Sequence, residues 1–146
     1  ITPRKNLKNA ATIMLKYNIN VHREWTGPLL ARCDLSALKQ VFLNFVLNAI
    51  DAMPEGGTLT INTAQDRDTV HIDFTDTGMG MPEETLERLF EPFFTTKKKG
   101  KGVGLGLSVA YGIIEEHGGS IQTRSELNKG TTFNVLLPLN GFNPDA

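Results

Sequence analysis

Residues 36–53 read SALKQVFLNFVLNAIDAM, and this stretch does more than any other to decide the fold. Its apolar residues recur with the period of an α-helix, and Asp34 stands before it, where a helix N-cap belongs. Pro54 and the glycine pair at 56–57 end the pattern. We therefore predict a helix over about 35–53 that is apolar over most of its surface and hence buried.

Polar side chains break this apolar surface along one line. Gln40, Asn44, Asn48 and Ala52 follow one another at a spacing of four, so they share one face of the helix. An unpaired buried polar group costs about 1–3 kcal/mol, so the two asparagines need partners. They are either structural amides that bond loop backbone or parts of a ligand site, because an amide oxygen suits Mg²⁺, which also takes phosphate oxygens.

A first glycine loop, Asp76-Thr77-Gly78-Met79-Gly80, follows a predicted strand over 69–75. Glycine lets backbone approach a flat ligand closely, and a carboxylate can accept a hydrogen bond from an exocyclic amine. Adenine carries such an amine where guanine carries a carbonyl, which the carboxylate would repel. The other interpretation is ordinary turn chemistry, for which Asp-x-Gly is common.

A second glycine loop, GKGVGLG at 100–106, leads into a predicted helix over about 104–117. Backbone N–H groups at a helix N-terminus favour polyphosphate. The loop has neither the GxxxxGK[ST] pattern nor the strand that a dinucleotide fingerprint needs before it. A flexible hinge and a solvated charge run are the alternatives, but the lysines at 97–99 and 101 beside the glycines indicate an anion-binding lid.

The remaining periodic segments complete an α/β two-layer sandwich, with several strands in one layer and three helices in the other. The sequence does not fix the order of the strands. His117 is expected near a helix C-terminus, where a partly cationic ring would suit the helix dipole. Further helices are predicted over 5–17 and 83–89, and strands over 19–25, 58–64, 69–75, 120–124 and 131–138, the last two joined by a turn at 125–130.

Composition narrows the class of protein. The 146 residues fit one domain, and a formal net charge of −1 gives no general attraction to nucleic acid or membrane. Cys33 is the only cysteine, which excludes an internal disulfide and a thiolate metal cluster. No apolar run reaches the roughly 18 residues that span a bilayer, and the N-terminus lacks a signal-peptide pattern. We expect a cytoplasmic segment, whose parent protein can be anchored in a membrane elsewhere.

Five motifs occur in the order typical of one family. The chain resembles the ATP-binding catalytic domain of bacterial sensor histidine kinases, of the superfamily shared with gyrase, the Hsp90 chaperones and MutL. Within the kinases it looks most like the nitrogen-regulatory type. The motifs are LKQVFLNFVLNAIDA (N box), DTGMG (G1 box), FEPFFTTK (F box), GVGLGLS (G2 box) and GTTF at 130–133, and the resemblance runs from about Ile19 to Pro138.

The resemblance implies the Bergerat fold, a mixed, mostly antiparallel sheet of about five strands backed by three helices, which binds ATP and Mg²⁺. Asn48 would ligate the metal, with Asn44 supporting phosphate or a metal-bound water. Asp76 would accept from the adenine amine, directly or through a water also held by Thr131. The base would be lined by Ala52, Gly80 and Met81, and Gly78 would also belong to the binding site. The lid would use Phe90, Phe93, Lys97, Gly102, Gly104, Leu105, Gly106 and Leu107.

Two departures bear on activity. Gyrase-like members carry a water-activating Glu where this chain has Asn44, and an amide cannot act as a general base. The phosphoacceptor H box is absent, since His22, His71 and His117 do not fit its pattern. Some members also carry a phosphate-contacting basic residue where this chain has Asp51, so that role is not transferred.

The family therefore implies half of a kinase. We expect an N-terminal helix over 1–18 leading in from a missing phosphoacceptor domain, a catalytic domain over 19–139 and a frayed tail over 140–146. Its partners would be the dimerisation and phosphoacceptor domain of the same protein and a response regulator, with no nucleic acid or membrane contact. The alternatives are a non-enzymatic nucleotide-sensing switch and an ATPase clamp of the gyrase or MutL kind.

Overall fold

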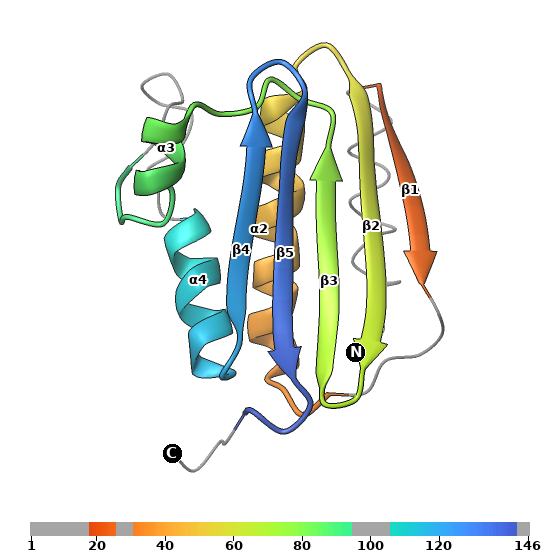
Figure 1. The fold of residues 1–146 in the computed structure, drawn as a ribbon, viewed down its shortest axis with the longest axis vertical. Coiled ribbons are helices and arrows are strands. Elements are labelled where there is room, and N and C mark those ends of the chain that lie inside the picture. Colours follow the sequence, from red (N-terminus) through yellow and green to blue (C-terminus); the bar gives the residue numbers. More distant parts are fainter. Residues whose placement is uncertain (1–17, 26–30, 95–105, 143–146) are drawn as a thin grey trace.

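The computed structural model describes residues 18–25, 31–94 and 106–142. Within these residues, five strands form one sheet in the order β1-β2-β3-β5-β4 (Figure 1). β1 pairs with β2 in parallel and every other pair is antiparallel, which confirms the predicted mixed, mostly antiparallel sheet. The strands are β1 (Ile19–Trp25), β2 (Gly57–Asp66), β3 (Thr69–Asp76), β4 (Ser120–Glu126) and β5 (Gly130–Pro138).

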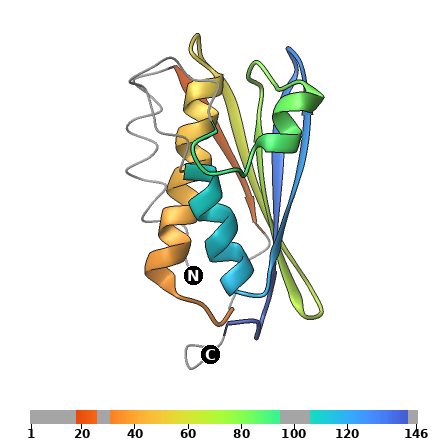
Figure 2. The ribbon, with the colours of Figure 1, turned by 90° about the vertical axis from the view of Figure 1, so that its left-hand side faces the viewer.

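Three helices complete the described fold: α2 (Leu35–Ala52), α3 (Glu83–Arg88) and α4 (Gly106–Glu116). α2 and α4 lie side by side on one face of the sheet, and α3 lies near the end where β4 turns into β5 (Figures 1 and 2). The predicted two-layer sandwich is thereby confirmed. None of these helices is both long and apolar enough to cross a membrane. The helix predicted over 5–17 lies outside the described residues.

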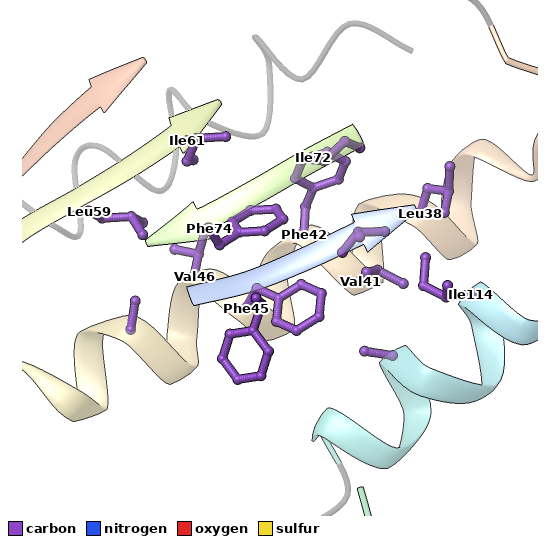
Figure 3. Packing of buried hydrophobic residues seen from close by; sticks show 14 of the residues in the cluster. Leu38, Val41, Phe42, Phe45, Val46, Leu59, Ile61, Ile72, Phe74 and Ile114 are labelled. Atoms are coloured by element: carbon purple, nitrogen blue, oxygen red, sulfur yellow. The ribbon is translucent and has the colours of Figure 1, made fainter. Parts of the chain in front are cut away.

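The apolar face of α2 fixes how this helix sits on the sheet. Its first turn is capped by Asp34, whose carboxylate accepts a hydrogen bond from the Ala37 N–H at 3.2 Å. Phe45 packs with its ring centroid 5.1 Å from that of Phe74 (Figure 3). Its centroid also lies 4.8 Å from that of Phe133. Aromatic contacts of this kind bury large apolar areas, so they hold α2 in one rotation about its axis. The face with the asparagines is set by that rotation.

The turn between β4 and β5 is shorter than predicted. Residues 125–130 were expected to form it, but Ser125 pairs with Thr131 and Glu126 pairs with Gly130, so the strands continue to Glu126. Asn128 takes a left-handed φ of 64°, which closes the short turn that remains. Ser125 is therefore a strand residue of β4 and not a turn residue.

His117 lies directly after α4, as predicted, but a partly cationic ring does not fit its hydrogen bonds. The ring is buried, and its Nε2 accepts a hydrogen bond from the Asp34 backbone N–H at 2.9 Å. Its Nδ1 lies 2.7 Å from the carbonyl oxygen of Ile113, to which it donates. A ring that accepts at one nitrogen and donates at the other is the neutral tautomer. His117 thus joins the C-terminal end of α4 to the N-terminal end of α2.

Candidate functional site

The carboxylate of Asp76 lies at the end of β3 and is 4% exposed. Its Oδ1 accepts hydrogen bonds from the backbone N–H groups of Gly78, at 2.9 Å, and Thr131, at 3.2 Å. Burial raises the pKa of Asp76, and these two hydrogen bonds oppose the rise. Oδ2 has no hydrogen-bond partner among the described residues. One carboxylate oxygen thus holds the local backbone, and the other can accept from a ligand.

The glycines of the loop after β3 are required by neighbouring backbone. A Cβ on Gly78 would lie 2.5 Å from the carbonyl oxygen of Ala52, which also accepts from the Met79 N–H at 3.0 Å. Gly80 has a φ of +67°, and a Cβ there would collide with the carbonyl of Glu126. These contacts give the glycines a structural role, and their expected close approach to a ligand stays a prediction. The loop is therefore held between the end of α2 and the β4–β5 hairpin.

Ser125 adds a connection that the sequence did not reveal. Its Oγ accepts from the Met81 N–H at 2.8 Å and lies 2.7 Å from the Oγ1 of Thr131. The same oxygen lies 3.1 Å from the carbonyl of Gly130. The sequence predicted a turn at residue 125 and therefore missed this role. The pairing of Ser125 with Thr131 in the strand register is the signal that identifies it. Asp76, Met81 and Thr131 are thus brought together at one end of the sheet.

The two asparagines of α2 differ in their surroundings. Asn44 is buried: its Oδ1 accepts from Gln40 Nε2 at 2.9 Å, and its Nδ2 donates to the carbonyl of Gly106 at 2.7 Å. Both ends of this amide have protein partners. Asn48, one turn further along, is half-buried, and its amide makes no hydrogen bond within the described residues. Asn44 therefore ties α2 to the start of α4, while Asn48 is the amide open to a ligand.

Only the last residue of the second glycine loop, Gly106, lies within the described residues. Gly106 is the first residue of α4, and Leu107 packs against the core. Phe90 packs on Tyr111, with ring centroids 5.1 Å apart, whereas the Phe93 side chain is 73% exposed at a left-handed φ of 65°. Four predicted lid residues, Lys97, Gly102, Gly104 and Leu105, lie outside the described part of the chain.

The donor set fits a magnesium ion shared with phosphates. Among the described residues, no cluster of three or more His, Cys, Asp or Glu side chains could hold a metal by itself. Mg²⁺ is commonly bound through one or two protein oxygens, with waters and substrate phosphates completing its shell. A single amide oxygen, that of Asn48, matches this need. Asn48 shares its helix face with Ala52, which contacts the loop after Asp76.

Comparison with known proteins identifies this combination of fold and site. Residues 33–141 match the family model described as "Histidine kinase-, DNA gyrase B-, and HSP90-like ATPase". Because this match covers more than half of the chain, the chain belongs to that family.

The relatives narrow the assignment to the histidine kinases. Sporulation kinase E of Bacillus subtilis is 51% identical over 108 residues, which cover 73% of this chain and 14% of that protein. The solved catalytic domain of the histidine kinase ThkA is 36% identical with a TM-score of 0.84, covering 94% of this chain and 90% of that one. Full-length ShkA, solved in complex with AMPPNP, is 26% identical with a TM-score of 0.81, covering 96% and 30%. The chain is thus the catalytic ATP-binding domain of a sensor histidine kinase, and it spans a small part of the curated relative.

Proposed function

We propose that this domain binds Mg-ATP and transfers the γ-phosphoryl group to a histidine on a separate dimerisation and phosphoacceptor domain. That histidine would in turn supply a response regulator in two-component signalling, with the transfer taking place in the cytoplasm. The proposal rests on one observation above all: Asp76 is buried and hydrogen-bonded through Oδ1, while Oδ2 has no partner among the described residues. Such an acceptor suits the exocyclic amine of adenine.

The remaining roles follow from the surroundings of each group. The half-buried amide of Asn48 would hold Mg²⁺, which when bound neutralises charge on the phosphates. Thr131, beside Asp76, would contact the base or a water on it, and the loop from Gly78 to Met81 would form the wall of the base site. Phosphoryl transfer needs positioning and charge stabilisation more than covalent chemistry from the protein. The residues named above would supply this positioning of the nucleotide.

Asn44 argues against a hydrolytic clamp. Its amide cannot take a proton from water, and both its ends are occupied by Gln40 and Gly106. With no general base at this position, we expect the nucleophile to be a histidine on another domain and not an activated water. This favours kinase activity over steady-state ATP hydrolysis.

The test combines binding with transfer. Calorimetric titration with ATP, ADP and GTP, each with and without Mg²⁺, should show a preference for adenine and a contribution from the metal. Addition of radiolabelled ATP and the cognate phosphoacceptor domain should label a histidine. Tight ATP binding without any labelling would favour a nucleotide-sensing switch. Rapid hydrolysis by the isolated domain would favour an ATPase clamp.

A further inference from the structure

The hydroxyl group of Ser125 contacts three groups from two segments around the base site. It accepts from the Met81 N–H at 2.8 Å, and it lies 3.1 Å from the carbonyl oxygen of Gly130 and 2.7 Å from Thr131 Oγ1. Ser125 and Thr131 are directly opposite each other in the β4–β5 pair, so the contact between their hydroxyls is built into the strand register.

The number of protons at this hydroxyl decides the direction of each hydrogen bond. A serine hydroxyl has one proton and two lone pairs. The Met81 N–H takes one lone pair, and the carbonyl of Gly130 can only accept, so it takes the proton of Ser125. The contact with Thr131 then forms only if Thr131 donates its own proton to the second lone pair of Ser125. This is the one arrangement in which all three contacts are hydrogen bonds.

The consequence is a change in what Thr131 offers to a ligand. With its proton directed to Ser125, its Oγ1 has only lone pairs left. Thr131 is the cross-strand partner of Asp76 and donates its backbone N–H to that carboxylate at 3.2 Å. The ionised carboxylate is also an acceptor without a proton. The side chains of Asp76 and Thr131 therefore offer two acceptors and no hydroxyl donor.

We infer that Ser125 is a positioning residue that holds the Thr131 hydroxyl as an acceptor and thereby strengthens the choice of a 6-amino purine over a 6-oxo purine. The inference rests on the proposed ATP-binding function. An amino group at the 6-position supplies the protons that two acceptors need, whereas a carbonyl there faces two sets of lone pairs. Without Ser125, the Thr131 hydroxyl can turn and donate to that carbonyl, which relieves the mismatch.

The test compares the dissociation constants of ATP and ITP, which carry an amine and a carbonyl at the 6-position. In Ser125→Ala, the ratio of the ITP constant to the ATP constant should fall by about three- to tenfold, the value of one hydrogen bond. Ser125→Thr keeps a hydroxyl and should keep the ratio. Thr131→Val removes the second acceptor and should also lower the ratio, and Ser125→Ala should add nothing in that background.

A purely structural role for Ser125 would weaken both nucleotides equally and leave the ratio unchanged. An unchanged ratio in Ser125→Ala, in a wild-type background that does prefer ATP, would overturn the inference and leave the ATP site intact. If Ser125→Ala does not fold, as judged by its circular dichroism, Thr131→Val decides alone, and an unchanged ratio there has the same meaning. A wild-type domain that does not prefer ATP to ITP would instead refute the adenine contact of the proposed function, and the inference with it.

Discussion

Asp76 holds the local backbone with one carboxylate oxygen, and the other oxygen is the one that we assign to the ligand. Its Oδ1 joins the loop after β3 to the start of β5 through two backbone N–H groups. Burial makes the ionised form of the carboxylate costly, and burial is accordingly the main cause of its raised pKa. A purely structural residue could avoid this cost by being an amide. The proposed contact with the adenine amine would account for the charge.

The pH dependence of ATP binding follows from this shift. Because the pKa of Asp76 is raised above its ordinary value of 3.8, the carboxyl group takes up a proton at a higher pH than an exposed aspartate does. ATP affinity should be complete above the raised pKa and should fall as pH decreases through it. Asp76→Asn should lose about 1.5–3 kcal/mol of binding at neutral pH, the value of a hydrogen bond to a charged group. Calorimetry over a pH series measures both effects.

The Asn variant is also the control for titration of the nucleotide phosphates, because those phosphates titrate alike in both proteins. The stability of the nucleotide-free domain should change in the opposite sense. A group whose pKa is raised by folding contributes stability that is fully present below pH 3.8 and is lost as pH rises through the folded pKa. An affinity ratio between wild type and Asp76→Asn that does not vary with pH would contradict the assignment.

At the scale of the element, α2 places two chemically identical amides in different roles. Asn44 bonds Gln40 and Gly106 and lies where α4 begins. Asn48, one turn on, is half-buried and has no amide partner among the described residues. The two amides differ because the start of α4 contacts α2 at Asn44. Asn44 should therefore matter for stability and Asn48 for metal-dependent chemistry.

Alanine variants should separate the two roles. Asn44→Ala leaves a donor on Gln40 without its partner and removes the side-chain hydrogen bond to the Gly106 carbonyl, so it should lower the free energy of unfolding by about 1–3 kcal/mol. Asn48→Ala should stay within about 0.5 kcal/mol of wild type in urea denaturation. In a transfer assay it should lose Mg²⁺-dependent labelling of the acceptor more than it loses adenine binding. Equal loss of stability in both variants would show that the two amides do not differ in role.

The sequence predicted the elements of this fold better than their connections. The apolar period and the Asp34 cap correctly indicated α2, because both signals lie within the helix itself. The sequence did not show that both ends of the Asn44 amide have protein partners, because one partner, Gly106, is 62 residues away in the chain. Ser125 was missed for a related reason: strand ends depend on pairing with a distant segment, which local composition does not reveal. The motif order indicated the family, while the geometry of the site had to come from the structure.

At the scale of the whole molecule, the helical layer is held together at the end opposite the nucleotide site by His117. The ring accepts from the backbone of Asp34, donates to Ile113 and stacks on Phe142, with ring centroids 4.6 Å apart. It thus connects the start of α2, the end of α4 and the segment that follows β5. The Asp34 N–H that it binds belongs to the residue that caps α2.

Removal of the ring should therefore weaken the whole domain and leave the chemistry of the site unchanged. His117→Ala leaves the Asp34 N–H without its partner, removes the ring's hydrogen bond to the Ile113 carbonyl and creates a cavity beside Phe142. We expect the free energy of unfolding to fall by about 2–4 kcal/mol. Urea denaturation measures this loss, and an unchanged m-value would show that the transition remains cooperative.

The matched control is His22→Thr, because His22 is an exposed residue of β1 whose side-chain contact with Glu24 is also exposed. That variant should remain within about 0.5 kcal/mol of wild type, since exposed ion pairs contribute little. Below its unfolding temperature, His117→Ala should keep the ATP affinity of wild type, because the ring lies at the opposite end of the helices from Asp76. A loss of affinity in the folded variant would mean that the two ends of the helical layer are coupled, and His117 would then act on the nucleotide site as well as on stability.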